Sequence, residues 1–231
     1  MNQIRKSNER GLTEISWLKS LHSFSFGNYN DPEWNQFGPL RVINEDHIAA
    51  SGGFRPHPHA DMEIITIVME GQLKHQDSMG NGSIISKGQV QYMSAGRGIQ
   101  HSEFNPSDIH SAHIFQIWIE ADQKGYEPRY EEKNLSRKQG KGWKTILSGK
   151  DIPDTIHVRQ DIRLDAGIFG KNENTSRTIH ENRKAWLQVA SGKIKIGEQV
   201  LEAGDALAVT TSGTLKIDPK EESELFFFDL F

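Results

Sequence analysis

Two short motifs in the sequence have the residue types and spacing of metal ligands. His57 and His59 form an H-x-H pair, and His101 and Glu103 form an H-x-E pair further along the chain. Successive side chains of a β-strand point to opposite faces, so each pair projects both members to one side of a strand. Three imidazoles and one carboxylate suit a divalent first-row metal and leave positions for water, substrate or dioxygen. The motifs therefore predict a metal site that is open to ligands.

The sequence between the motifs predicts the strands that would bring them together. A β-branched run follows Glu63, and short strand-like stretches come after it, separated by turns that contain Gly and Asn. Short strands at regular spacing are typical of an all-β sandwich or barrel. A small barrel of this kind can hold one small ligand at its mouth. The expected strands are 64–69, 72–77, 83–86 and 89–93.

Composition excludes several classes of function. The formal net charge of −4 argues against a general nucleic-acid binder, which is usually basic. The chain has no cysteine, so disulfides and thiolate metal ligands are excluded. The first residues contain no apolar leader, and the longest apolar runs are too short to span a membrane. We expect a cytoplasmic protein with no membrane partner and no direct nucleic-acid partner.

Around the motifs, further segments have strand-like patterns. Residues 22–29 alternate His and Phe with small residues, which predicts a half-buried strand. Its aromatic side chains either pack the edge of the barrel or line the substrate pocket. Residues 40–43, 47–50 and 109–121 continue the β pattern, and the last of these is apolar on both faces, so it should be covered on both sides.

The second half of the chain repeats this pattern without the ligands. Residues 123–144 are charged and poor in aliphatics, which predicts an inter-lobe connection with a short helix and a solvated basic cluster at Arg137, Lys138, Lys141 and Lys144. Short strands then follow at 185–190, 193–196, 198–201 and 206–209. Aligning the glycines of the two halves places Thr178, His180, Ile217 and Pro219 at the positions of the four ligands. We interpret this half as a duplicated barrel that binds no metal and braces the first.

The two motifs resemble those of the cupin superfamily, written G-x5-H-x-H-x3,4-E-x6-G and G-x5-P-x-G-x2-H-x3-N. His57, His59 and Glu63 match the first, although Gly71 comes one residue late. The second matches at Gly88, Gly98, His101 and Asn105, with Ser94 at the usual proline place. H-P-H near M-E, followed by MSAGRGIQHSE, resembles the pirin branch of the cupins. The resemblance continues in WLKSLHSFSFGNYNDP and FQIWIEAD, and it covers residues 7 to about 130.

The pirin resemblance implies a fold and a ligand set. The fold would be an all-β bicupin of two small jelly-roll-like barrels packed together, residues 1–130 with the metal site and residues 131–231 without it. The metal ligands would be His57, His59, His101 and Glu103. Glu63, the usual cupin ligand, would instead accept a hydrogen bond from a ligand imidazole, although spacing alone leaves both carboxylates open. The remaining histidines are interpreted as structural, with His75 and His113 the two that a strand could carry towards the pocket.

The same resemblance, strongest to bacterial pirin-like quercetin 2,3-dioxygenases, implies an oxidoreductase of the EC 1.13.11 type. It would open the heterocycle of flavonols such as quercetin and release carbon monoxide, with Glu103 as the catalytic general base. One divalent metal is expected; Fe(II) suits the site, and Mn, Co, Ni or Cu can also occupy it. Its partners would be a phenolic small molecule and dioxygen, and a monomer is expected. Two alternatives fit the same motifs: a non-catalytic, metal-dependent regulatory or protein-binding pirin, and a dioxygenase for another phenolic or enol substrate.

Overall fold

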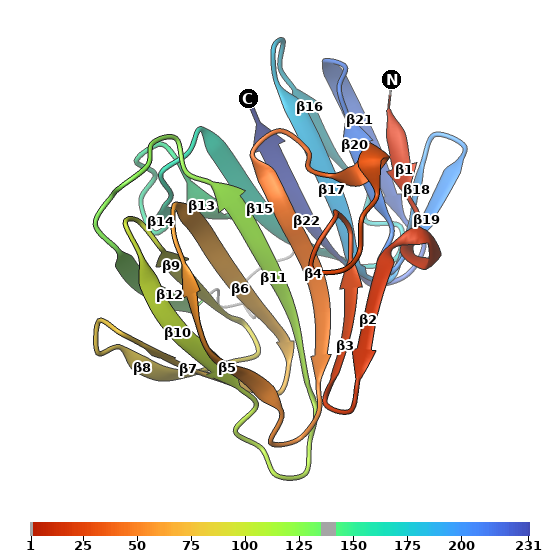
Figure 1. Cartoon of the computed structure of the whole chain (residues 1–231). Helices are drawn as coiled ribbons and strands as arrows, with labels where there is room; N and C mark the ends of the chain where they lie inside the picture. The colour runs from red at the N-terminus through yellow and green to blue at the C-terminus, as the bar shows by residue number, and fades with distance from the viewer. Residues whose placement is uncertain (1, 135–141) are drawn as a thin grey trace. The chain divides into compact units, whose positions relative to one another are not determined.

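The computed structural model describes residues 2–134 and 142–231, and by their contacts these fall into two compact units. The N-terminal unit is Gly11–Ser136, and the C-terminal unit combines Arg137–Phe231 with Met1–Arg10. Each unit contains one seven-stranded sheet and one four-stranded sheet, which confirms the all-β prediction (Figure 1). The described residues include no helix long and apolar enough to cross a membrane.

The seven-stranded sheet of the N-terminal unit is antiparallel throughout. The central strand, residues 112–120, is largely apolar on both faces, and Ile114, Phe115 and Ile117 are each fully buried, as the sequence predicted for this segment. In spatial order the strands are β12 (Arg129–Asn134), β9 (Gln89–Ser94), β6 (Met62–Glu70), β11 (Ala112–Glu120), β4 (Leu40–Ile48), β3 (Leu18–His22) and β2 (Gly11–Ile15). A 3-10 helix, η2 (Pro32–Trp34), lies between β3 and β4 in the sequence.

The four-stranded sheet carries both ligand motifs. Its order is β5 (Gly53–His59), β10 (Ile99–Phe104), β7 (Gln72–Asp77) and β8 (Gly82–Ser86), and Figure 1 shows these strands side by side. Side chains of both sheets meet in one core: Val68 and Ile114 of the large sheet pack with Leu73 and Ile85 of the small one, all of them fully buried. Burial of these aliphatic side chains, at about 1.5–3 kcal/mol each, therefore holds the motif-bearing sheet against β6 and β11.

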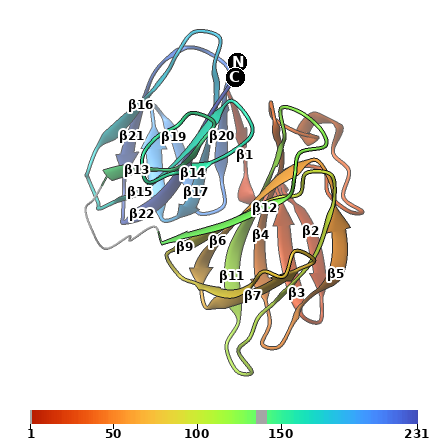
Figure 2. The same cartoon turned by 90° about the vertical axis from the view of Figure 1, so that its left-hand side faces the viewer.

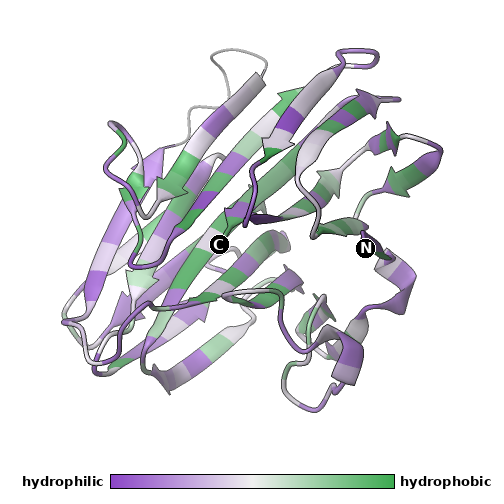
Figure 3. Cartoon of the chain, turned by 90° about the horizontal axis from the view of Figure 1, so that it is seen from above, coloured by the Kyte–Doolittle hydropathy of each residue, from purple (hydrophilic) through white to green (hydrophobic). Residues whose placement is uncertain are grey.

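The C-terminal unit repeats this arrangement of sheets. The large sheet runs β1 (Gln3–Arg5), β20 (Ala206–Val209), β17 (Lys184–Ser191), β22 (Ser223–Leu230), β15 (Ile162–Phe169), β13 (Gly142–Ser148) and β14 (Ile156–His157). The small sheet runs β16 (Thr175–Ile179), β21 (Gly213–Pro219), β18 (Lys193–Ile196) and β19 (Gln199–Glu202). Along the strands of both units, hydrophobic and hydrophilic residues form bands, as expected where one face of a strand is buried (Figure 3).

The first residues of the chain belong to the C-terminal unit. β1 pairs antiparallel with β20, with Gln3 opposite Ala208, and Figure 2 shows the two strands next to each other. The 3-10 helix η1 (Ser7–Glu9) follows, and Asp205 accepts hydrogen bonds from the backbone N–H of Ser7, at 2.7 Å, and from Lys6 Nζ, at 2.8 Å. Residues 3–5 are therefore an integral part of a sheet whose other strands lie between residues 142 and 230.

Two sequence-based expectations about local structure are wrong. Residues 23–29 do not continue as a strand, because the chain turns at Gly27, where φ is +57°, and only a bridge between Phe26 and Tyr29 remains. Residues 129–134 were expected in a connection, but they form β12, which pairs with β9 at the end of the sheet. Charged side chains are common on such edge strands because they discourage pairing with other chains. The basic cluster lies outside the described residues, except for Lys144 in β13.

Candidate metal centre

Strands β5 and β10 bring the two histidine motifs together. They pair antiparallel, with His101 opposite His57 and Ile99 opposite His59. β5 is an edge strand, so Pro56 and Pro58, which have no N–H to donate, are tolerated before and between the two histidines. The register shifts between His101 and Glu103, because two residues of β5 oppose one of β10 there. The H-P-H sequence is thus compatible with a strand at a sheet edge, because only one side of such a strand needs N–H donors for pairing.

The three imidazoles converge as ligands of one ion would. The ring centroids of His57, His59 and His101 are 4.5–4.8 Å apart, and the ring planes are inclined to one another by 51–80°. Each imidazole lone pair lies in its own ring plane, so inclined planes can share one ion where they intersect. If each ring offers one nitrogen, the three nitrogen atoms lie within 4.8 Å of one another. Nε2 of buried His101 has no hydrogen-bond partner among the described residues. These features fit a bound divalent metal.

Two of the three imidazoles, those of His59 and His101, are in the protonation state that a metal requires. Burial lowers the pKa of His59 to about 4, and burial together with the neighbouring His57 and His59 lowers the pKa of His101 to about 2. Both rings are therefore neutral at pH 7, and neutral imidazole is the form that binds metal ions. Nδ1 of His57 lies 2.8 Å from the carbonyl oxygen of Arg55. If His57 donates its hydrogen there, Nε2 is left free as a ligand.

Glu103 lies beside the three histidines, with its side chain turned into the unit. It is 1% exposed and accepts hydrogen bonds from Gln116 Nε2, at 2.7 Å, and from Thr66 Oγ1, at 3.4 Å. Its carboxylate forms a ligand group with His101 and His75, and it lines the same pocket as His57 and His59. Burial raises the pKa of Glu103 to about 7, a value that suits a proton acceptor near neutral pH.

Asp46 is a second buried carboxyl near Glu103. It lies on β4 opposite Ile114 of β11 and is 1% exposed. The pKa of Asp46 is raised to about 7, chiefly by burial. A hydrogen bond with Ser20 lowers this pKa, and the negative charge of Glu45 raises it. The folded state therefore binds this proton more tightly than the unfolded state, whose pKa is near 3.8. The protonated Asp46 carboxyl therefore contributes its full stabilisation of the folded state below about pH 4, near the unfolded pKa. This contribution is lost as the pH rises towards the folded pKa of about 7.

We expect Asp46→Asn to stabilise the metal-free protein increasingly as the pH rises. The amide cannot ionise, so the gain over the parent chain should be small at pH 4.5 and roughly 1–3 kcal/mol at pH 8. Urea unfolding of both proteins in the presence of a chelator measures this difference. Glu14→Gln, at an exposed position on β2, is the matched control and should show no pH-dependent gain. A gain for Asp46→Asn that is equal at both pH values would contradict the prediction.

Sequence reasoning gave no role at this site to two residues of β7: it left His75 as a structural histidine that a strand could carry towards the pocket, and it did not consider Asp77. In the pairing of β7 with β10, His75 is opposite Glu103 and Asp77 is opposite His101. The Nδ1 atoms of His75 and His101 are 3.5 Å apart. The signal for this was present in the sequence, because H-x-D has the same two-residue period as H-x-H and H-x-E. His75 was weighed as a single histidine and not as a member of a pair.

Glu63 lies away from the imidazoles. Strand alternation places it on the face of β6 opposite Thr66, which contacts Glu103. It is fully buried, and its carboxylate accepts hydrogen bonds from the hydroxyls of Tyr92 and Ser94. These contacts differ from the expected role of orienting a ligand imidazole, because the two-residue period carries Glu63 to the other side of the sheet.

A further group of possible ligands, Glu45, His47 and His113, has a less suitable geometry. The rings of His47 and His113 are stacked, 4.3 Å apart and inclined by only 14°, and His113 Nε2 is 3.0 Å from Glu45 Oε1. An ion in the plane of one of two nearly parallel rings lies far from the plane of the other. The group is therefore better described as a His113–Glu45 hydrogen bond covered by the ring of His47.

An aromatic pocket of about 510 Å³ opens beside the imidazoles. Trp118 stands edge-on to His59, with ring centroids 4.7 Å apart, and its indole N–H donates to Gln116 Oε1 at 3.3 Å. Of the N-terminal aromatic residues, Trp17 and Phe26 line the pocket, whereas Phe24 is buried. The complete lining is Trp17, Phe26, Gly53, Phe54, Arg55, His57, His59, Glu103, Gln116 and Trp118. This pocket combines metal-type ligands with apolar walls that suit a flat aromatic molecule.

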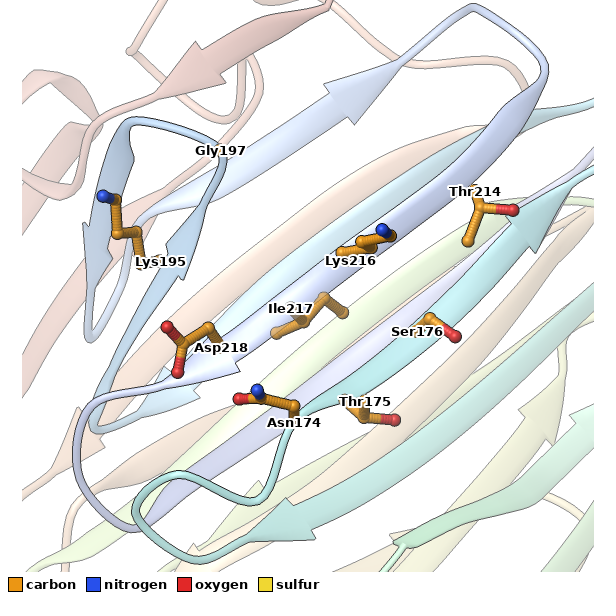
Figure 4. A pocket seen from close by; sticks show the side chains of 9 residues that line it. All are labelled: Asn174, Thr175, Ser176, Lys195, Gly197, Thr214, Lys216, Ile217 and Asp218. Carbon is orange, nitrogen blue, oxygen red and sulfur yellow. The ribbon is translucent and has the colours of Figure 1, made fainter.

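The C-terminal unit contains a hollow of a different kind. It has a volume of about 550 Å³ and lies over β16, β21 and β18, where hydroxyl groups, Lys195, Lys216 and Asp218 surround it (Figure 4). At the positions aligned with the four ligands, Thr178 and His180 are exposed, while Ile217 and Pro219 are buried. Ile217 belongs to the hydrophobic core of this unit. Buried apolar residues thus stand at the two positions aligned with His101 and Glu103.

Both halves of the chain match known protein families. The Pirin family pattern matches residues 3–119, and the pattern of the quercetinase C-terminal cupin domain matches residues 145–230. Quercetin 2,3-dioxygenase of Escherichia coli (strain K12) is 43% identical over 230 residues, covering 100% of this chain and 99% of that protein. The crystal structure of YhhW from Escherichia coli superimposes with a TM-score of 0.97 at 42% identity, covering 100% of this chain and 98% of the other. A crystal structure of the bacterial pirin YhhW in complex with nickel(II) gives a TM-score of 0.95 at 41% identity, covering 100% and 99%.

Proposed function

The chain belongs to the pirin family of cupins, and on that basis we propose that it is a metal-dependent dioxygenase that opens the heterocycle of flavonols such as quercetin and releases carbon monoxide. The observation that carries the proposal is the pocket itself. Three imidazoles with inclined planes meet at one side of it, and the indole and phenyl rings of Trp17, Phe26, Phe54 and Trp118 form much of the remaining wall. A flat phenolic substrate and dioxygen are the partners that such a pocket accommodates.

Four side chains would hold the metal: His57, His59, His101 and Glu103. Three imidazoles and a carboxylate suit Fe(II), and Mn, Co, Ni and Cu bind similar sets, so geometry and supply decide among them. The nickel(II) complex of a relative that is 41% identical supports the proposal that this chain binds a divalent first-row ion. The free Nε2 of His101 and the orientation of His57 by Arg55 provide two nitrogen ligands that are already in place.

The protein side chains each have a part in the proposed reaction. When bound, the metal supplies a Lewis-acidic centre that lowers the pKa of a flavonol hydroxyl. Glu103 takes the hydroxyl proton, and the hydrogen bonds from Gln116 and Thr66 keep its carboxylate in the pocket. The aromatic walls stack against the substrate rings and exclude water. The electron-rich flavonolate then reacts with dioxygen across C2 and C4, the heterocycle opens and carbon monoxide leaves.

Flavonol-dependent oxygen consumption tests the proposal. The protein is stripped of metal and reconstituted separately with Fe(II), Mn(II), Co(II), Ni(II) and Cu(II), with His59→Ala as the control and with carbon monoxide measured alongside. We expect turnover with one or two metals, release of carbon monoxide, and loss of both in the control. Stoichiometric metal binding without oxygen uptake for any metal would overturn flavonol cleavage. That result would favour another phenolic or enol substrate, or a metal-dependent regulatory role with a protein partner.

A further inference from the structure

Behind His101, on the side away from His57 and His59, lies a polar pair on β7. Nδ1 of His101 is 3.5 Å from Nδ1 of His75, at the outer limit of a hydrogen bond, and Nε2 of His75 is 3.2 Å from Oδ2 of Asp77. The three side chains form a continuous row. At its far end is Nε2 of His101, the buried nitrogen that has no partner among the described residues.

The hydrogens along this row have only one consistent order. The Asp77 carboxylate accepts the backbone N–H groups of Met79 and Asn81, so it is an acceptor for His75 as well, and Nε2 of His75 carries the hydrogen. Nδ1 of His75 is then an acceptor, which agrees with the amide nitrogen of Gln91 at 3.1 Å. Nδ1 of His101 faces the same lone pair at 3.5 Å, so it carries its hydrogen and shares this acceptor with Gln91. This leaves Nε2 of His101 with a bare lone pair, which is the form that binds a metal.

The row is held rigidly in place. His75 is fully buried, and its ring is stacked on that of Tyr130, with centroids 4.8 Å apart and an inclination of 24°. The hydroxyl of Tyr130 is fixed in turn by Ser83, at 2.6 Å. Asp77 is anchored by its contacts with the turn that follows β7, including Asn81 Nδ2 at 2.9 Å. Neither residue can turn away without breaking several buried contacts.

We propose that His75 and Asp77 are positioning residues that keep His101 in its metal-binding tautomer. The inference rests on the proposed metal centre and adds two residues to it. Metal-bound histidines usually donate their other ring N–H to a carboxylate, a carbonyl or water, and loss of that partner costs about 10- to 100-fold in metal affinity. In this chain a second imidazole stands between the ligand and the carboxylate, so Asp77 determines the tautomer of His101 across His75.

Asp77→Asn reverses the row once the side-chain amides of Gln91 and Asn81, which donate to His75 Nδ1 and Asp77 Oδ2 in the parent chain, turn over so that their oxygens accept. Oδ1 would still accept the N–H groups of Met79 and Asn81, so the new amide nitrogen faces His75 and donates to it. The hydrogen of His75 moves to Nδ1, and Nδ1 of His101 must then accept. His101 carries its hydrogen on Nε2, facing the place of the metal. We expect Ni(II) affinity to fall about 10- to 100-fold, measured by competition with a chelating dye on the full chain.

Two further measurements separate this effect from a loss of structure. Nitrogen-15 NMR of the histidine rings in the metal-free protein reports the tautomer of His101 directly, and we expect hydrogen on Nδ1 in the parent chain and on Nε2 in Asp77→Asn. Asn81→Ala, which removes another contact of the same carboxylate, is the matched control and should change neither the tautomer nor the affinity by more than about twofold, since it leaves His75 untouched. Thermal unfolding of all three metal-free proteins checks that they are folded.

The outcomes distinguish this inference from the proposed function. An unchanged His101 tautomer in Asp77→Asn, or unchanged Ni(II) affinity with an inverted tautomer, would overturn the role of the row. If the parent chain bound no Ni(II), the metal centre itself would be refuted, while the ring spectra would still show whether Asp77 sets the tautomer. Weakened binding together with an inverted tautomer would establish the role.

Discussion

His101→Ala is expected to remove the metal and, with it, all flavonol-dependent oxygen uptake. His101 is the most buried of the three imidazoles, its ring lies 4.5 Å from that of His57 and 4.8 Å from that of His59, and it alone connects them to His75. Loss of a residue that only supports a ligand costs about 10- to 100-fold in affinity, so loss of the ligand itself should exceed about 100-fold. Metal content after dialysis, with oxygen uptake on the same samples, measures the effect.

His113→Ala is the matched control for this experiment. It removes a half-buried histidine of the same unit, one whose ring is stacked with His47 and not inclined to it. The variant should keep its metal and most of its turnover. If instead His113→Ala lost metal while His101→Ala kept it, the ion would belong to the group of Glu45, His47 and His113, and the assignment of the centre would be wrong.

Glu103→Gln should separate proton transfer from metal binding. The amide has nearly the shape of the carboxylate and its oxygen can still accept the hydrogen bond from Gln116, but it cannot take a proton from the substrate. We expect metal to remain bound more weakly and turnover to fall about 10²- to 10⁴-fold, the usual contribution of a general base. Oxygen uptake at saturating metal, followed across pH, provides the measurement. The rise in rate with pH that reflects ionisation of Glu103 should be absent from the variant.

Glu63→Gln provides the comparison for that variant. Glu63 is equally buried but lies on the other face of β6, with Tyr92 and Ser94 as its partners. Turnover and its pH dependence should survive this change. Full turnover in Glu103→Gln with metal bound would exclude Glu103 as the base, and loss of turnover in Glu63→Gln alone would point to the carboxylate that general cupins use.

The converging histidines could be predicted from sequence because their geometry is local. A two-residue period on a strand fixes which side chains share a face, and this holds whatever the rest of the fold does. The strands 72–77, 193–196 and 206–209 were predicted with the bounds observed. Gly71 and Gly192 immediately precede the strands 72–77 and 193–196. Their φ angles are +72° and +83°, and a side chain at either position would also collide with neighbouring backbone.

What the sequence did not reveal depends on pairing between distant segments. The partnership of His75 with His101 follows from β7 lying next to β10, and the place of Glu63 follows from the two sheets packing on one face of β6 only. β12 was missed because its residues are charged, and charge is compatible with a strand when that strand ends a sheet. The two-residue period of His75 and Asp77 is visible in the sequence, but it does not say which strand lies beside theirs.

The pairing of β1 with β20 has a consequence for how the protein is made. Gln3 to Arg5 leave the ribosome about 200 residues before their partners on β20, Ala206 to Ala208. At roughly 5–20 residues per second, this separation is a delay of roughly 10–40 s. During synthesis the first segment must stay unpaired while the N-terminal unit folds behind it. Until β1 pairs with it, the edge of β20 presents open N–H and C=O groups to any other nascent chain. Fusion or trimming at the N-terminus should therefore reduce the yield of folded protein through the last unit to be synthesised.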